Sequence, residues 1–181
     1  MHSLGDLIFA LNQWLHTTPL NGFALWIQTL PINHVIVGNF WVVPFTQSIH
    51  ILAIAAVFGS AAMINLRVLG LIGMGRTVEQ TAERYLPWIW WGLLVLLATG
   101  AVLIFSDPIR EFTNAIFWFK MIVIAITALL SLWFQHSVRR APERWELTPE
   151  RRAIIRASAT GFLVLWCVIM VAGRWIAYAP T

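Results

Sequence analysis

The chain has 181 residues, of which 59% are hydrophobic and 11% are charged, and its formal net charge is +4. This composition, with a mean hydropathy of +0.75, excludes an ordinary soluble domain and indicates a membrane protein. The hydrocarbon core of a bilayer is about 30 Å thick and is crossed by roughly 20 apolar residues in a helix. The apolar runs are continuous rather than alternating, so they predict helices rather than barrel strands.

Residues 3–15 (SLGDLIFALNQWL) have the pattern of an amphipathic surface helix. The apolar residues recur at helical spacing: Leu4, Leu7, Ile8, Leu11 and Leu15. The polar residues Asp6, Asn12 and Gln13 fall off this stripe. A second piece, residues 21–30, lies between Pro19 and Pro31 and is too short to span a bilayer. We therefore predict that residues 1–40 form an interfacial segment on the outer side of the membrane.

Four later runs reach the length of a membrane span: 41–66, 86–106, 114–137 and 153–178. We expect Pro87 to open the second run, because a helix tolerates proline in its first turn, and Asp107-Pro108 to close it. Asn114 or Thr113 is expected to cap the third run. The predicted fold class is an all-α integral membrane four-helix bundle, formed by residues 41–181 and preceded by the interfacial helix.

The basic residues indicate the orientation of the spans. Nine lie in or beside the connections after spans one and three: Arg67, Arg76, Arg84, Arg139, Arg140, Arg144, Arg151, Arg152 and Arg156. Only Arg110, Lys120 and Arg174 belong to the other side, so the positive-inside rule places both chain ends outside. We predict a multi-pass protein of a bacterial inner membrane with periplasmic termini, in contact with lipids. Because the membrane topology explains the excess of basic residues, we expect no nucleic-acid partner.

Three ionisable residues lie inside the predicted spans and in the same half of the bilayer. At a rise of about 1.5 Å per residue, His50 is about 13 Å below the outer end of its span, Lys120 about 9 Å and Arg174 about 6 Å. Met170 is about 12 Å deep by the same measure. A charge inside a membrane is costly and usually faces protein or marks a functional site.

Each of these residues has more than one interpretation. Arg174 and Lys120 are close enough to the interface to act as anchors whose charges reach the headgroups. His50 is too short and too deep for that, so its ring either forms a hydrogen bond to a neighbouring helix or binds a ligand. Haem iron and copper both take imidazole, thioether sulfur such as that of Met170 suits Cu(I), and a proton relay or quinone contact is a further alternative. His34 is the histidine placed to supply a second ligand.

Four stretches carry a family resemblance: QSIHILAIAAVFGSAAMINLRVLGL (47–71), RYLPWIWWGLLVLLATGAVLIFSDP (84–108), NAIFWFKMIVIAITALLSLWF (114–134) and LWCVIMVAGRWIAYAP (165–180). Together they resemble an uncharacterised family of small bacterial four-helix membrane proteins. The layout is also distantly similar to CopD-type copper proteins and to small haem-binding membrane proteins, namely the membrane protoporphyrinogen oxidases and b-type cytochromes.

The resemblance implies a haem axial ligand at His50, a functional Lys120 and a Gly-Arg pair at Gly173-Arg174. In that family a glutamate is common three residues before the histidine. This chain has Gln47 there, so His50 has no carboxylate partner at that position. The predicted cofactor-binding residues are His50, Lys120, Arg174 and Gln47, and the predicted metal ligands are His50 and Met170.

Three functions follow as hypotheses. The leading one is redox chemistry or electron transfer with haem b or a quinone in the outer half of the bundle, with His50 as ligand. The first alternative is copper binding or transport at His50 and Met170. The second alternative is a structural subunit of a larger membrane complex or a homo-oligomer. Sequence motifs of soluble enzymes, such as phosphate-binding glycine loops, are absent.

Overall fold

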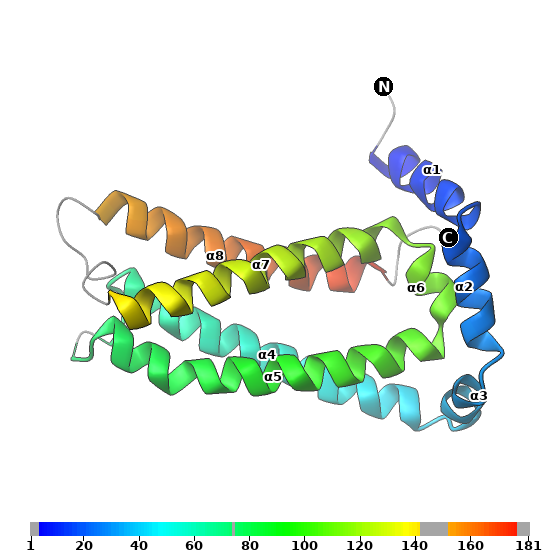
Figure 1. Cartoon of the computed structure of the whole chain (residues 1–181), viewed down its shortest axis with the longest axis horizontal. Coiled ribbons are helices and arrows are strands. Elements are labelled where there is room, and N and C mark those ends of the chain that lie inside the picture. Colours follow the sequence, from blue (N-terminus) through cyan, green and yellow to red (C-terminus); the bar gives the residue numbers. More distant parts are fainter. Residues whose placement is uncertain (1–3, 74, 142–151, 177–181) are drawn as a thin grey trace. The chain divides into compact units, whose positions relative to one another are not determined.

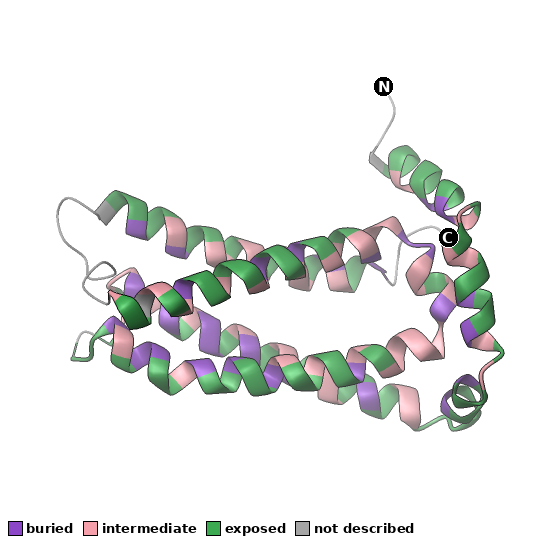
Figure 2. Ribbon diagram, viewed as in Figure 1, coloured by how far each residue is buried: buried purple, intermediate pink, exposed green. Residues whose placement is uncertain are grey.

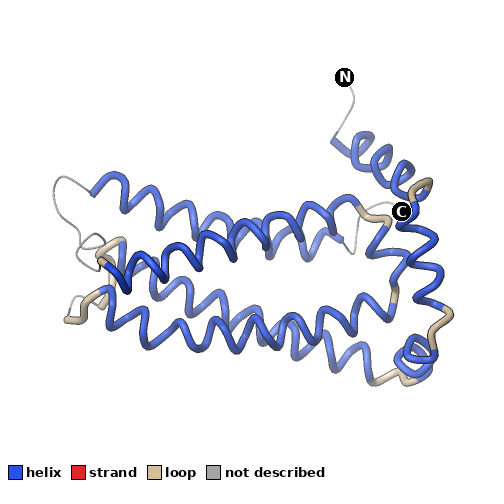
Figure 3. Tube along the Cα trace, viewed as in Figure 1, coloured by secondary structure: helices blue, strands red, loops and turns tan. Residues whose placement is uncertain are grey.

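The computed structural model describes residues 4–73, 75–141 and 152–176, and every regular element within these ranges is a helix (Figures 1 and 3). The predicted all-α fold class is confirmed. Most of the charged connection at 139–152, including Arg144, lies outside the described residues. So do the last residues of the fourth predicted run, at 177 and 178.

The chain divides into two compact units. Unit 1 contains Met1–Leu52, Val95–Ile122 and Met170–Thr181, and unit 2 contains Ala53–Leu94 and Val123–Ile169. Each unit includes a segment of all four long helices. His50 and Lys120 belong to unit 1, whereas nine of the twelve basic residues of the sequence belong to the ranges of unit 2.

Four helices are long and apolar enough to cross a membrane: α4 (Val42–Val68), α5 (Val78–Ser106), α7 (Ala115–Arg140) and α8 (Arg152–Trp175). Their most apolar windows have hydropathies of 2.0 to 2.2, and these windows are at most 33% buried within the protein. Many large apolar residues of these helices are exposed, and exposed residues are green on the ribbon of Figure 2. Such surfaces suit contact with lipid. The presence of four spans and the description as a multi-pass membrane protein are confirmed.

The start predicted for the second span is wrong. Helix α5 begins at Val78, nine residues before Pro87, and Pro87 lies inside it. The helix starts there because Thr77 and Gln80 form a reciprocal cap: the Thr77 hydroxyl accepts from the Gln80 amide, and the Gln80 side-chain oxygen accepts from the Thr77 amide, both at 3.2 Å. This capping box satisfies N–H groups that the first turn leaves open, and the helix accommodates Pro87 downstream of it.

Unit 1 also contains the short helices α1 (Leu4–His16), α2 (Pro19–Gln28), α3 (Pro31–Gly38) and α6 (Pro108–Phe112). Proline occupies the first turn of α2, α3 and α6, where its missing N–H costs nothing. Helix α2 packs against α6 (Figure 1). The rings of Phe23 and Phe112 meet edge to face with centroids 5.5 Å apart. The helix predicted near the amino terminus is confirmed as α1.

The packing of α1 differs from its predicted stripe at Asn12. This residue, placed off the apolar stripe by the sequence, is fully buried, whereas Leu7 is 55% and Leu11 is 47% exposed. The Asn12 side-chain oxygen accepts a hydrogen bond of 2.8 Å from the Ala115 amide. That amide belongs to the first turn of α7, whose N–H groups have no partner within their own helix. Asn12 is therefore buried because its side chain binds an N–H group that has no partner within α7.

Two more asparagines join separate segments of unit 1. Asn33 of α3 donates to the carbonyl oxygen of Phe105 at 2.7 Å. Asn114 accepts from the Ile116 amide at 2.9 Å, so the predicted cap of the third span is confirmed, and its amide nitrogen donates to the carbonyl oxygen of Ile176 at 3.4 Å. These bonds fix the chain around the ends of α5, α7 and α8 that belong to unit 1.

Candidate functional site

His50 lies on α4 and is half-buried, with its ring against α5. Its Nδ1 atom is 2.7 Å from the Thr99 hydroxyl oxygen. The next residue, Gly100, lies beside the ring, since a Cβ there would be in ordinary contact with the His50 Cε1 atom at 3.7 Å. The ring thus rests on a threonine and a glycine of α5. This contact agrees with the prediction that His50 faces protein.

The hydrogen bonds of Thr99 identify the protonated ring nitrogen. The Thr99 hydroxyl is 2.6 Å from the carbonyl oxygen of Val95, one turn earlier in α5, and donates to it. A hydroxyl has one proton, so Thr99 accepts from His50, and Nδ1 is the donor. In a neutral ring, the Nε2 atom then has a free lone pair. No described residue forms a hydrogen bond with Nε2, which leaves it available to a ligand.

Lys120 of α7 is half-buried and lies against α8 at Gly173. A Cβ on Gly173 would be 3.7 Å from both Cε and Nζ of the lysine, and 3.9 Å from its Cδ. The lysine side chain therefore lies beside Gly173, at a distance that leaves room for a methyl group there. The charge of Lys120 acts on both His50 and Glu111, which places the lysine near each of them.

Glu111 was not singled out in the sequence and lies on α6, outside the membrane spans. Burial raises the pKa of its carboxyl group, nearby Lys120 and Arg110 lower it, and Asp107 raises it. In unit 1, the charge of Lys120 therefore acts on both the imidazole of His50 and the carboxyl group of Glu111. We name His50, Thr99, Gly100, Glu111, Lys120 and Gly173 the outer site.

The other predicted site residues lie on the same elements but with different exposure. Gln47 and Arg174 are exposed, and Met170 is half-buried. Among the described residues, neither Gln47 nor Met170 forms a hydrogen bond with His50. His34, the predicted source of a second ligand, is exposed on α3. The joint cofactor site of these residues with His50 stays a prediction.

The part of the chain that the structure describes contains no group of three or more His, Cys, Asp or Glu side chains that could hold a metal ion. A metal at the outer site would therefore use His50 and take its other ligands from elsewhere. Haem would meet this condition, because the porphyrin would supply most of the ligands of the iron and His50 would supply one from the protein.

Sequence comparison places most of the chain in one family. Residues 27–179 match a protein family of unknown function, DUF6644. No curated protein and no solved structure matches the chain. The match covers α3 to α8 and every residue of the outer site.

Proposed function

The chain belongs to the DUF6644 family, and on the basis of its outer site we propose that it is a membrane redox protein that binds haem through His50. The observation that carries this proposal is the hydrogen bond between His50 and Thr99. Histidines that bind a metal commonly donate their other ring N–H to an acceptor, which fixes the tautomer and the ring orientation. Thr99 has this role, and the opposite nitrogen, Nε2, is free to coordinate iron.

The surrounding charges suit the same cofactor. A haem has two propionate groups, and Lys120 provides a positive charge within electrostatic range of His50. Arg174 follows Gly173, the residue on which Lys120 rests, and is a second cation of unit 1. The bound haem would supply one-electron chemistry. The chain would hold the iron, orient the imidazole and neutralise the propionates.

The proposal includes an orientation. The nine basic residues in or beside the connections after α4 and α7 would face the cytoplasm of a bacterial cell, and both chain ends would face the periplasm. Haem would then lie near the outer surface of the inner membrane, where it could exchange electrons with a quinone or a periplasmic carrier. A cysteine-accessibility assay with residues introduced in α1 and in the 69–77 connection tests this orientation.

A visible spectrum of the detergent-solubilised full chain, before and after reduction with dithionite, tests the haem. We expect a Soret band after haem loading, and a His50→Ala variant that binds haem at least about tenfold more weakly. His136→Ala is the matched control, because His136 is an exposed histidine of unit 2. No Soret band in the loaded wild type, or equal haem affinity in the two variants, would overturn the proposal.

The same preparation separates the alternatives. Copper that co-purifies with the wild type and is lost in His50→Ala and Met170→Leu variants would favour copper binding. A quinone that co-purifies without haem would favour a quinone site, in which the Nε2 atom of His50 accepts the proton of a quinol hydroxyl.

A structural role has its own supporting observation. The side chains of Asn12, Asn33 and Asn114 bond backbone groups of distant segments, so polar residues do hold the helices of unit 1 together. A subunit role predicts that the protein migrates in a larger membrane complex or as a homo-oligomer. Loss of that complex in a variant that still binds haem would separate the two roles.

A further inference from the structure

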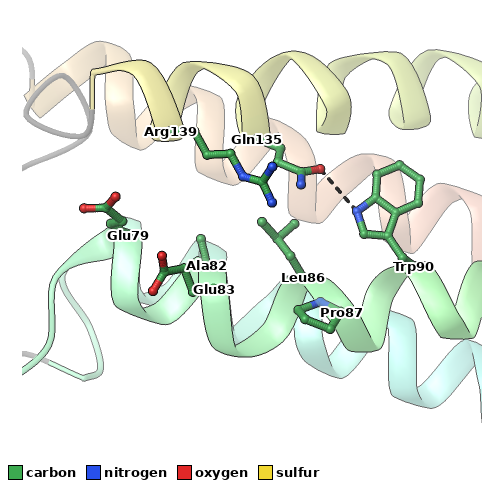
Figure 4. Close-up of a pocket in the computed structure, with 8 residues that line it drawn as sticks. All are labelled: Glu79, Ala82, Glu83, Leu86, Pro87, Trp90, Gln135 and Arg139. Atoms are coloured by element: carbon green, nitrogen blue, oxygen red, sulfur yellow. Dashed lines mark hydrogen bonds between the residues drawn. The ribbon is translucent and has the colours of Figure 1, made fainter.

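A pocket of about 180 Å³ opens in unit 2, between the first turns of α5 and the last turns of α7 (Figure 4). Its charged and polar lining consists of Glu79, Glu83, Gln135 and Arg139, and its apolar wall includes Leu86 and Trp90. This volume is below the roughly 300–1,000 Å³ of pockets that enclose a whole drug-sized ligand. The pocket therefore fits a small polar group that is part of a larger molecule.

The pocket lies where the charged ends of two membrane helices meet their apolar parts. Glu79 and Glu83 precede the apolar run of α5, and Arg139 follows that of α7. Exposed tryptophans occur just inside this level: Trp88, Trp90, Trp91 and Trp133. Tryptophan prefers the depth of the lipid headgroups. The pocket is thus at the height where a phospholipid has its phosphate and its amine or alcohol.

The charges of the lining are not neutralised by one another. Glu79, Glu83 and Arg139 form no ion pair within the described residues, and Figure 4 shows the Arg139 guanidinium above Leu86, apart from both carboxylates. Arg139 and Glu83 are exposed, and Glu79 is half-buried. One cation and two anions therefore face the same space with their hydrogen-bonding capacity available.

The wall between these charges can accept an acyl chain. The Trp90 indole nitrogen donates to the Gln135 side-chain oxygen at 3.2 Å, which satisfies the one polar atom of the indole and fixes the ring (Figure 4). Leu86, Pro87 and the indole then continue the pocket as an apolar surface toward the membrane core. The charged pocket and the apolar surface beside it together match a ligand that has a polar headgroup and a hydrocarbon tail.

We propose that this pocket binds the headgroup of a zwitterionic phospholipid of the phosphatidylethanolamine class. Arg139 would bind the phosphate, and Glu79 and Glu83 would bind the ammonium group. Guanidinium suits a phosphate oxygen pair, and a carboxylate suits a primary ammonium group. A headgroup with a phosphate but no amine, such as phosphoglycerol, would meet the two carboxylates as an anion and be repelled.

Native mass spectrometry of the full chain tests this site. The protein is transferred from micelles that contain equal amounts of phosphatidylethanolamine and phosphatidylglycerol with identical acyl chains, and the retained lipid is measured. We expect the wild type to retain the ethanolamine lipid preferentially. Because hydrogen bonds to charged groups are strong, Arg139→Gln should lower this retention by about tenfold. Arg140→Gln, the same change at the next exposed residue, should leave it unchanged.

The carboxylates provide an independent comparison. Glu83→Gln removes a charge without changing the size of the side chain, so the preference for ethanolamine over glycerol should fall by at least about threefold. Asp6→Asn removes one charge from α1 and serves as its control. Helix content by circular dichroism verifies that each variant is folded. Equal retention of the two lipids by the wild type, or equal retention by the Arg139 and Arg140 variants, would overturn the proposal.

Discussion

Lys120 rests on the backbone of α8 at Gly173, where an added Cβ would lie 3.7 Å from both the Cε and the Nζ atom of the lysine. A distance of 3.7 Å is an ordinary carbon contact, so a methyl group fits and a longer side chain does not. The only lysine of the sequence is thus separated from the α8 backbone by about the width of a methyl group.

The effect of a substitution at Gly173 on Lys120 should therefore depend on the size of the new side chain. Gly173→Ala should keep Lys120 in place, whereas Gly173→Leu should displace it. Since the chain has no other lysine, the rate of side-chain labelling by an amine-reactive reagent reports the exposure of Lys120 directly. We expect faster labelling only in Gly173→Leu. Gly161→Leu is the control on the same helix, because a Cβ at Gly161 meets no atom within 4 Å. Equal labelling in all variants would contradict this arrangement.

Thr99→Val should weaken both the folded protein and the proposed binding of haem. Valine has the shape of threonine but accepts no hydrogen bond, so the His50 ring loses the acceptor that fixes it. We expect a loss of about 1 kcal/mol in the free energy of unfolding, measured in detergent mixtures. Loss of such a supporting bond typically lowers metal affinity by about 10- to 100-fold. Thr99→Ser should restore both values, and Thr160→Val, at an exposed threonine, should change neither.

The stability of the protein should depend on pH through Glu111. Burial raises the pKa of this carboxyl group above its ordinary value of 4.5, so the folded protein holds the proton more tightly than the unfolded chain does. The contribution of Glu111 to the free energy of unfolding is therefore greatest below pH 4.5 and falls as the pH rises through the raised pKa.

Glu111→Gln should remove this decline of the unfolding free energy with pH. Lys120→Met should enlarge it, because the lysine lowers the pKa that burial raises. Unfolding measured from about pH 4 to about pH 8 provides the comparison. A Glu111→Gln variant whose stability falls with pH as steeply as that of the wild type would contradict the assignment.

Gly92 of α5 should not accept even a methyl group. A Cβ there would lie 2.4 Å from the Cγ2 atom of Val57, a fully buried residue of α4 in the same unit. Valine is stiff at its first side-chain angle and cannot move aside easily. We expect Gly92→Ala to cost about 1–3 kcal/mol of unfolding free energy. The cost should be smaller in a Val57→Ala background, and Gly59→Ala, where no atom lies within 4 Å, should be tolerated.

Hydropathy and local caps predicted the helices of this protein, because both depend on neighbouring residues. The spans followed from continuous apolar runs, and the Asn114 cap followed from its position before one of them. The start of α5 was missed although its signal was present. The pattern Thr77-x-x-Gln80 is a capping box, and it is a stronger signal for the helix start than Pro87 is.

The contacts of the outer site could be predicted only in part. His50 was found because an ionisable ring in an apolar run is unusual. Thr99 and Gly100 were missed because their role depends on the register of α5 against α4, which no local pattern specifies. Glu111 was missed because its burial results from the packing of α6. Asn12 was placed off the buried stripe because helical periodicity cannot show that a backbone group far along the chain needs an acceptor.

The bond from Asn12 to Ala115 imposes an order on biogenesis. Asn12 leaves the ribosome 103 residues ahead of the amide that it binds. During that interval α4 and α5 are synthesised, and the Asn12 side chain does not yet have the Ala115 amide as a partner. The docking of α1 therefore coincides with the arrival of the third crossing, and protection of α1 from protease during translation would time the completion of that step.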